Sequence, residues 1–178
     1  PFLKNAAFSF SLLCRNMRSY NAIREKGEKD VLSGLYNRNR YERDLPTYPD
    51  LFRQSLACIY VDVNGLHELN NSEGHDKGDR MLQVVALEIR EMFSKNNCYR
   101  IGGDEFLAYV TDRQDPAVRK CVKDFVSIVG SAGYSVAVGV ATESAGGIDV
   151  GALCRKAEKR MYLDKEEHYR VLREQQGR

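Results

Sequence analysis

The order of two apolar patterns along the chain constrains its fold more than any other feature. Short continuous apolar runs are typical of buried strands, whereas apolar residues at every third or fourth position are typical of helices. After residue 50 the patterns predict strand, helix, strand, strand, helix and strand, over residues 56–61, 76–93, 98–101, 106–110, 117–129 and 134–141, and then a last helix over 148–173. This order predicts an α/β (α+β) domain with the ferredoxin-like split βαβ arrangement.

Acidic residues stand at the ends of two predicted strands. In a ferredoxin-like sheet the first and third strands are antiparallel neighbours, so Asp62 should lie beside Asp104 and Glu105. Neighbouring carboxylates repel one another unless a cation lies among them, and oxygen ligands suit Mg²⁺ or Mn²⁺. Each residue alone could equally belong to a turn or a helix cap, but their convergence favours a metal and phosphate site. An EF-hand loop is excluded, because His67 stands where that loop requires glycine.

The first 26 residues contain no internal proline or glycine and predict a leading helix. Its apolar residues follow heptad spacing, which suits either a short coiled coil or an amphipathic helix packed on its own domain. They are Leu3, Ala6, Phe10, Leu13, Met17 and Tyr20. Gly27 ends this helix, and residues 30–45 are expected to form a polar helix. We therefore divide the chain into an N-terminal linker or signalling helix, 1–29, and a folded domain, 30–178.

Composition limits the partners and the compartment. With 27 Lys and Arg against 25 Asp and Glu, the net charge of +2 argues against a DNA or RNA partner. The five scattered cysteines form no CxxC pair, so we expect reduced thiols and a cytoplasmic location. No apolar run approaches the roughly 18 to 20 residues of a membrane span. The sequence begins at Pro1 without methionine, which suggests a fragment of something longer.

Three motifs follow one another in the sequence. Residues 102–106 read Gly-Gly-Asp-Glu-Phe, residues 30–38 read Asp-Val-Leu-Ser-Gly-Leu-Tyr-Asn-Arg, and residues 62–79 run from an aspartate through Gly-His to Gly-Asp. In this order they resemble the GGDEF family of diguanylate cyclases, over about residues 30 to 170. The resemblance implies a core fold like that of nucleotide cyclases and polymerase palms. It also implies condensation of two GTP into cyclic di-GMP, two Mg²⁺ or Mn²⁺ per active site, and a homodimer in which each domain holds one GTP.

The resemblance assigns the metal and catalytic residues by position. Asp62, the Val63 carbonyl, Asp104 and Glu105 would be the metal ligands. Asp104 and Glu105 would be catalytic, with Asp104 as the candidate base for the attacking hydroxyl. Oxygen ligands of this kind suit a divalent cation that shares its coordination with substrate phosphates.

The resemblance also assigns the substrate-binding residues. Asn70 and Asp79 would read the guanine edge, since an amide and a carboxylate match its donors and acceptors. His75 would lie near the substrate or pack at a helix start, and Lys165 would meet the triphosphate or remain a solvated charge. The two glycines of the signature would let phosphates approach the backbone. The full substrate-binding set is Asn70, His75, Asp79, Gly102, Gly103 and Lys165.

The sequence departs from the family pattern mainly where phosphates are expected. His67 replaces a lysine, Leu66 replaces a phenylalanine, and Tyr169 stands where a basic residue follows Lys165 by four positions. Asp164 and Arg160 replace alanines on the last helix. We expect these changes to affect phosphate affinity and to leave the metal ligands in place.

Two further consequences follow for function. Phe93 and Asn96 stand where the family's inhibitory product-binding site has arginine and aspartate, so that site should be missing. The leading interpretation is an active diguanylate cyclase in a bacterial signalling protein. The alternative is a catalytically weak or inactive GTP-binding regulatory module. A cyclase making another cyclic dinucleotide is disfavoured by Asp79, which suits guanine.

Overall fold

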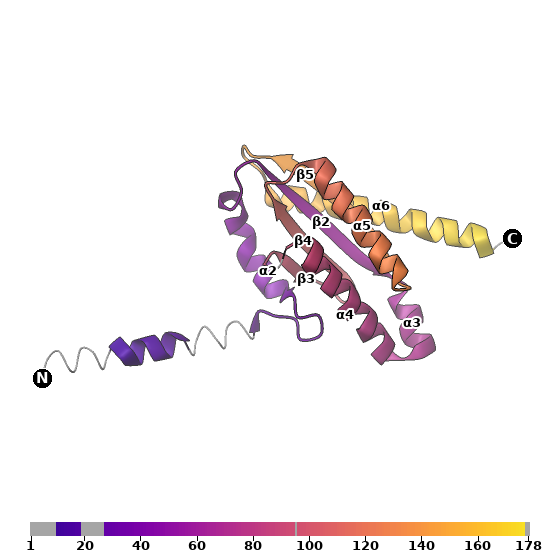
Figure 1. Cartoon of the computed structure of the whole chain (residues 1–178), viewed down its shortest axis with the longest axis horizontal. Coiled ribbons are helices and arrows are strands. Elements are labelled where there is room, and N and C mark those ends of the chain that lie inside the picture. The colour runs from indigo at the N-terminus through magenta and orange to yellow at the C-terminus, as the bar shows by residue number, and fades with distance from the viewer. Residues whose placement is uncertain (1–9, 19–26, 95, 177–178) are drawn as a thin grey trace, which may run out of the picture.

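The computed structural model describes residues 10–18, 27–94 and 96–176. Residues 10–18 are helical, in agreement with the predicted leading helix, and its remaining residues lie outside the described part. From residue 27 onward the elements form one layered domain (Figure 1). In chain order they are β1 (Tyr36–Asn37), α2 (Arg38–Asp44), the 3-10 helix η1 (Leu45–Asp50), β2 (Ser55–Asn64), α3 (Leu66–Glu73), α4 (His75–Met92), β3 (Cys98–Arg100), β4 (Glu105–Thr111), α5 (Asp115–Ser131), β5 (Ser135–Ser144) and α6 (Val150–Gln176).

The sheet has the predicted topology with one added edge strand. Its order is β1-β3-β4-β2-β5, with β2 antiparallel to both β4 and β5. The split βαβ arrangement and the central position of the first long strand are therefore confirmed. Strand β1 pairs in parallel with β3 at the edge. Within the described residues, no helix has the length and apolarity needed to cross a membrane.

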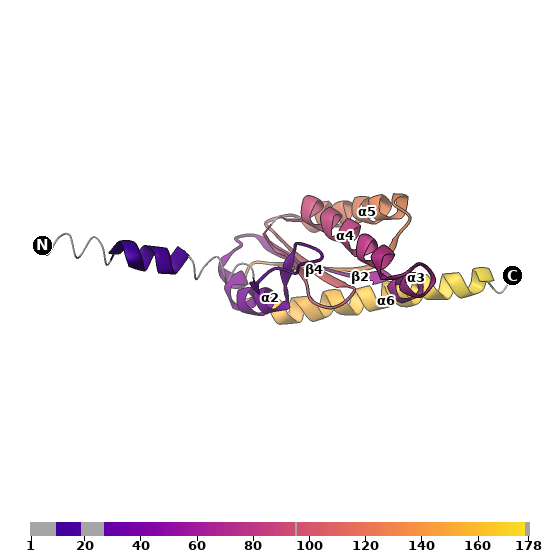
Figure 2. The same ribbon diagram turned by 90° about the horizontal axis from the view of Figure 1, so that it is seen from below.

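Two hydrophobic cores lie on the two faces of the sheet. Helices α4 and α5 cover one face, and α6 covers the other (Figure 2). Because successive side chains of a strand point to opposite faces, β2 supplies both cores. Ala57, Ile59 and Val61 belong to the core under α4 and α5, while Cys58 and Tyr60 belong to the core under α6. This double burial explains why β2 is a continuous apolar run in the sequence.

Two local predictions need correction. The expected helix over 30–45 is wrong in its first part, because residues 30–35 form a turn and the helix is confined to Arg38–Asp44. Asp30 Oδ1 accepts hydrogen bonds from the Ser33 N–H (2.8 Å) and hydroxyl (2.6 Å), and Gly34 has a left-handed φ of 70°. Local side-chain bonds of this kind compete with helix formation. Helix α3, which we had not predicted, begins directly after the left-handed Gly65.

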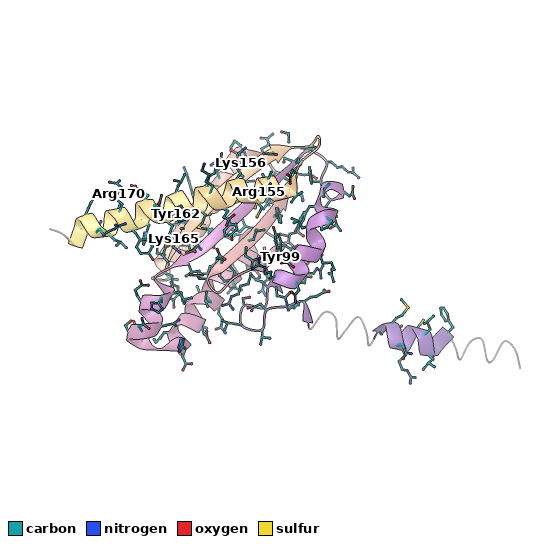
Figure 3. The ribbon with its side chains drawn as sticks, turned by 180° about the vertical axis from the view of Figure 1, so that it is seen from behind. Tyr99, Arg155, Lys156, Tyr162, Lys165 and Arg170 are labelled. Carbon is teal, nitrogen blue, oxygen red and sulfur yellow. The ribbon has the colours of Figure 1, made fainter. Side chains whose placement is uncertain are left out.

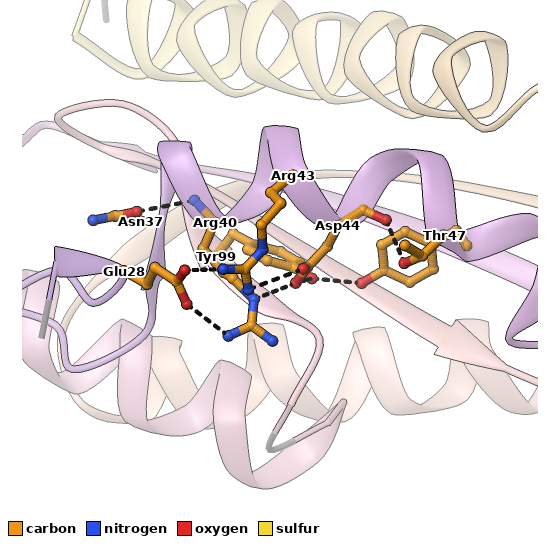
Figure 4. A network of polar contacts seen from close by, with 8 residues as sticks. Glu28, Asn37, Arg40, Arg43, Asp44, Thr47 and Tyr99 are labelled. Atoms are coloured by element: carbon orange, nitrogen blue, oxygen red, sulfur yellow. Dashed lines mark hydrogen bonds and ion pairs between the residues drawn. The ribbon is translucent and has the colours of Figure 1, made fainter. Parts of the chain in front are cut away.

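A polar network fastens the N-terminal end of the domain to α2 and β3 (Figure 4). The Glu28 carboxylate accepts from Arg40 at 3.1 Å and also pairs with Arg43. Arg40 donates to Asp44 at 2.6 Å, and Asp44 in turn accepts from the Tyr99 hydroxyl at 3.0 Å. The Glu28 side chain is only 12% exposed. Residue 28 is therefore a folded part of the domain, connected through side chains to the strand that precedes the signature turn.

Replacing Glu28 by alanine should destabilise the domain by roughly 2 kcal/mol, because two partly buried guanidinium groups lose a shared acceptor. The free energy of unfolding in urea measures this effect. The matched control is Glu42→Ala, since Glu42 pairs with Arg38 on the surface, where both side chains are more than 60% exposed. That change should cost less than about 0.5 kcal/mol. Equal losses in the two variants would mean that the network does not stabilise the junction.

Candidate functional site

The predicted convergence of acidic residues is present at the end of β2. Asp62 lies directly opposite Glu105 in the antiparallel ladder, and the Val63 N–H donates to the Asp104 carbonyl at 3.0 Å. The Asp62 side chain is 7% exposed, and its Oδ1 lies 2.7 Å from Lys165 Nζ. Strands β2 and β4 and helix α6 thus place carboxylates and one ammonium group at a single edge of the sheet.

The charges at this edge interact. Burial raises the pKa of Asp62 above its usual value, and the nearby Asp104 carboxylate adds to this shift, although Lys165 opposes it. Partial burial acts to lower the pKa of Lys165, but the hydrogen bond and charge of Asp62, together with Asp104, raise it overall. Asp62 is therefore a carboxylate whose ionised form depends on a nearby cation.

The donor set at this edge suits a divalent cation. Its carboxylate oxygens are hard ligands, and a bound cation would offset the charge of Asp104, which raises the pKa of Asp62. In the described part of the chain, however, no group of three or more His, Cys, Asp and Glu side chains is arranged to hold a metal ion. The Lys165 ammonium is the cation on Asp62 in this structure. The carboxylates therefore have the chemistry of metal ligands. A bound metal ion would have to share the Asp62 carboxylate with Lys165, or Lys165 would have to move away from it.

The signature turn is held in place by residues on both sides. Arg100 donates to the Gly103 carbonyl at 2.6 Å and 3.2 Å, and its other end donates to Asp30 at 3.0 Å. The Tyr60 hydroxyl donates to Glu105 Oε1 at 3.2 Å. Burial, followed by the charge of Glu105, raises the pKa of Tyr60, so this tyrosine remains a donor. No role was predicted for these three supporting residues, although Asp30 opens one of the motifs quoted above.

Gly102 is required for the position of Glu105. A Cβ atom at residue 102 would lie 2.5 Å from Glu105 Oε2 and 3.2 Å from its Cβ. Alanine at this position should displace the carboxylate and lower the rate of the expected GTP condensation by about 100-fold, the scale of a misplacement of about 1 Å. The control is Gly130→Ala, because a Cβ at Gly130 meets nothing within 4 Å. Initial rates of that expected reaction measure both variants, and an unchanged rate in Gly102→Ala would contradict this role.

The predicted guanine-reading residues come from adjoining helices. Asn70 lies on α3 and Asp79 on α4, and the two helices are connected through the glycine at position 74. The Asn70 side chain packs directly on Gly78, where a Cβ would collide with Asn70 Oδ1. This contact brings Asn70 beside the residue that precedes Asp79. His75 is the exposed first residue of α4.

Two residues of α6 that differ from the family pattern attach this helix to the sheet. Asp164 Oδ2 accepts from the Val138 N–H at 2.9 Å, and Arg160 donates to the Val140 carbonyl. The Val138 N–H and the Val140 carbonyl both belong to the backbone of β5, which is an edge strand of the sheet. These residues therefore satisfy the backbone of an exposed edge and do not join the acidic site. His67, on α3, forms a hydrogen bond within its own helix, with 3.0 Å between its Nε2 and Asn71 Nδ2.

A cavity of about 490 Å³ opens beside the acidic edge, against the middle of α6. Asp62 and Glu105 line it from the sheet. Lys165, which Figure 3 shows on α6, lines it from the helix. Phe93, at the position of the family's inhibitory arginine, is instead packed edge-to-face on Phe125 at 5.3 Å in the core. The acidic edge therefore borders an open cavity next to β2, β4 and α6.

The comparisons with known proteins agree with this architecture. Residues 28–170 match the family described as diguanylate cyclase, GGDEF domain. The chain is 36% identical over 108 residues to the cyclic di-GMP phosphodiesterase PdeB of Shewanella oneidensis, which covers 60% of this chain and 12% of PdeB. It is 34% identical over 82 residues to a diguanylate cyclase of Vibrio cholerae, covering 44% of this chain and 26% of that protein.

A similar solved structure contains a coiled coil and a GGDEF domain of DgcB from Caulobacter crescentus in complex with c-di-GMP. The TM-score is 0.79 at 18% identity, with 92% of this chain and 93% of that chain covered. At this identity the likeness shows the fold. The curated relatives named above are several times longer than the aligned segment, so the chain corresponds to one part of such proteins.

Proposed function

The chain belongs to the GGDEF family of diguanylate cyclase domains, and from this membership we propose that it condenses two GTP molecules into cyclic di-GMP and two pyrophosphates. The observation that carries the proposal is the meeting of Asp62 with Asp104 and Glu105 at one sheet edge, next to Lys165. Incubation with GTP and Mg²⁺, followed by chromatography of the nucleotides, tests it. Formation of cyclic di-GMP is the expected result.

The proposed reaction is a pair of phosphoryl transfers. In each, the 3′-hydroxyl oxygen of one GTP bonds to the α-phosphorus of the other, and the bond from that phosphorus to pyrophosphate breaks. Asp104 is our candidate acceptor for the hydroxyl proton, since it lies at the acidic edge beside Val63. Lys165 can move from Asp62 to the phosphates, because its side chain is 30% exposed and flexible.

A divalent cation fits this arrangement. Asp62, Asp104, Glu105 and the Val63 carbonyl would hold it, and two such ions per site would neutralise phosphate charge and lower the pKa of the attacking hydroxyl. Asn70 and Asp79 would orient guanine through its donor and acceptor edge, with His75 close by. Gly102 and Gly103 leave the backbone of the signature turn free of side chains near the phosphates.

The alternative is a GTP-binding regulatory module with little or no turnover. Two observations favour it: Tyr169 replaces a cation at the phosphate end, and PdeB is a phosphodiesterase by name. The two functions differ in one measurement, because a regulatory module would bind GTP without forming cyclic di-GMP. The intact set of Asp62, Asp104 and Glu105 supports the cyclase.

The setting of the domain is also a proposal. The product joins two GTP molecules, so we propose a homodimer in which the leading helix connects the chains and the folded domain, which includes Glu28, is the catalytic part. The presence of a coiled coil together with the GGDEF domain in the DgcB structure supports this arrangement. We propose that the reaction takes place in the cytoplasm, where GTP is available. We also propose that a sensor domain lies upstream of this domain in a longer protein.

A further inference from the structure

Two cysteines from different elements meet in the core between the sheet and α6. Cys58, in β2, is 0% exposed and belongs to the hydrophobic core on the face of the sheet that α6 covers (Figure 2). Cys154 lies one turn after the start of α6 and packs against the same core, but it remains partly exposed. The pair thus combines a buried thiol with an accessible one.

Two tyrosines complete this cluster. The Tyr41 hydroxyl donates a hydrogen bond to Cys154 Sγ at 3.5 Å. Tyr109 stands directly opposite Cys58 in the antiparallel ladder of β2 and β4, and its ring stacks on that of Tyr41 with 6.5 Å between the ring centroids. The buried Tyr109 hydroxyl has no hydrogen-bond partner among the described residues, so it is available as a further donor. Hydrogen-bond donors around a sulfur stabilise its thiolate form.

The two thiols differ in acidity. Hydrogen bonding by the Cys58 thiol, and then by the Tyr41 hydroxyl, lowers the pKa of Cys154 to about 7, although burial acts in the opposite direction. The charge of Glu158, one turn later on α6, also opposes this shift. Burial raises the pKa of Cys58 well above its ordinary value, so Cys58 keeps its proton. At neutral pH Cys154 is therefore the nucleophilic sulfur, and Cys58 is the protonated thiol beside it.

We propose that Cys154 reacts with hydrogen peroxide and that Cys58 then closes a disulfide between β2 and α6. In the first step the Cys154 thiolate bonds to one peroxide oxygen, the O–O bond breaks and hydroxide leaves, so the sulfur is oxidised to a sulfenic acid and the peroxide is reduced. In the second step the Cys58 sulfur bonds to the Cys154 sulfur, the S–O bond breaks, and the hydroxyl leaves as water with the Cys58 proton. This chemistry does not depend on the proposed function.

The disulfide would join the two elements that also meet at the acidic edge. Asp62 follows Cys58 by four residues on the same face of β2, and Lys165 follows Cys154 by eleven residues, or three turns, on the same face of α6. The thiol pair and the Asp62–Lys165 ion pair are therefore two successive connections between one strand and one helix. A covalent bond at the first connection would fix the spacing of β2 and α6 beside the second.

Peptide mapping after peroxide treatment tests the proposal. Trypsin places the five cysteines on five different peptides, because Lys or Arg lies between each successive pair. The parent chain, treated with hydrogen peroxide and then with iodoacetamide, should yield the Cys58 and Cys154 peptides joined by a disulfide that dithiothreitol reverses. Cys121 is the internal comparison, because it is also partly exposed but lies on α5. It should remain mostly available to iodoacetamide.

Two variants separate the roles of the neighbours of Cys154. Cys58→Ser keeps a hydrogen-bond donor but removes the second sulfur, so peroxide should leave a sulfenic acid at Cys154 that dimedone traps. Tyr41→Phe keeps the ring and removes the hydroxyl, so it should slow the reaction of Cys154 with iodoacetamide at pH 7 by about threefold. Tyr134→Phe is the matched control, because Tyr134 packs on the core of the other face of the sheet. It should leave that rate unchanged.

The outcomes decide between a reactive pair and two inert thiols. Absence of the linked peptide from the peroxide-treated parent, or a disulfide that appears only between chains on non-reducing electrophoresis, would overturn the proposal. Equal rates for Cys154 in Tyr41→Phe and the parent would also contradict it, since the hydroxyl would then not activate the sulfur. Thermal unfolding shows whether each variant is folded. The linked peptide is sought in the parent chain, so a poorly folded variant does not affect that result.

Discussion

Asp104→Asn should lower the rate of cyclic di-GMP formation by about a thousand-fold and leave the domain folded. An amide has nearly the same shape as the carboxylate but carries no charge, so it cannot hold a divalent cation or accept the hydroxyl proton. Loss of one preorganised electrostatic group typically costs about 100- to 1,000-fold in rate, and Asp104 has two roles in the proposed reaction. Initial rates with GTP and Mg²⁺, followed by chromatography, measure the effect.

The fold should survive because the structural contact of residue 104 is made by its backbone. The Asp104 carbonyl accepts from the Val63 N–H, and asparagine keeps that bond. Asp124→Asn is the matched control, since Asp124 is exposed on α5, on the opposite face of the sheet from α6. It should retain the parent rate. Turnover at the parent rate in Asp104→Asn would mean that this carboxylate is not part of the reaction.

The long-range placement of this site was predictable because it depends on strand order. The apolar runs fixed the order of the elements, and the split βαβ topology then required Asp62 and the signature turn to meet. The observed register, Asp62 opposite Glu105, confirms that step. Residues more than forty positions apart could be paired without side-chain detail, since the order of the elements indicated the split βαβ arrangement.

Short elements escaped prediction for a physical reason. Strand β1 has two residues, and its pairing with β3 cannot be read from a two-residue pattern. Helix α3 has eight residues between two glycines and buries none of them completely, so its apolar periodicity is weak. In the turn at 30–35, side-chain hydrogen bonds of Asp30 outweigh helix propensity. Local chemistry decided these segments, and the apolar pattern carried no signal for them.

The side-chain contacts of α6 also required the structure. The 2.7 Å pair between Lys165 and Asp62 depends on how closely α6 approaches the sheet. That approach is allowed at Gly139, where a Cβ would collide with the backbone of Ala157. Position 169 is a tyrosine, and the side chain of Arg170, one residue later, pairs on the helix surface with Glu167 at 2.6 Å and Glu174 at 2.7 Å.

Diluting the protein 100-fold should lower its specific activity by close to the same factor, if the two domains associate weakly. Each chain carries one set of predicted metal and guanine residues, whereas the product joins two GTP molecules, so two domains must face each other. When most of the protein is monomeric, the dimer fraction per chain falls in proportion to total concentration. Light scattering at each dilution, together with initial rates, gives the oligomeric state and the activity on the same sample.

We propose the leading helix as the means of association. Phe10, Leu13 and Met17 are 69%, 57% and 58% exposed, and they follow the heptad spacing noted above. Phe10→Glu combined with Leu13→Glu adds two negative charges to this stripe, so it should steepen the concentration dependence without touching the acidic site. Ser11→Glu combined with Arg15→Gln is the control, because it changes the net charge by the same amount away from the stripe.

The two pairs of substitutions separate association from charge. If the stripe joins the chains, only the Phe10 and Leu13 variant should need higher protein concentration to reach the parent rate, and both variants should converge when concentrated. A helix with so few heptads contributes little to the free energy of association. Loss of the stripe should therefore raise the protein concentration that gives half-maximal specific activity and leave the maximal specific activity unchanged. Specific activity that stays flat over the dilution series, with the parent chain monomeric throughout, would contradict a dimeric mechanism, since a single domain would then be completing a reaction between two bound nucleotides.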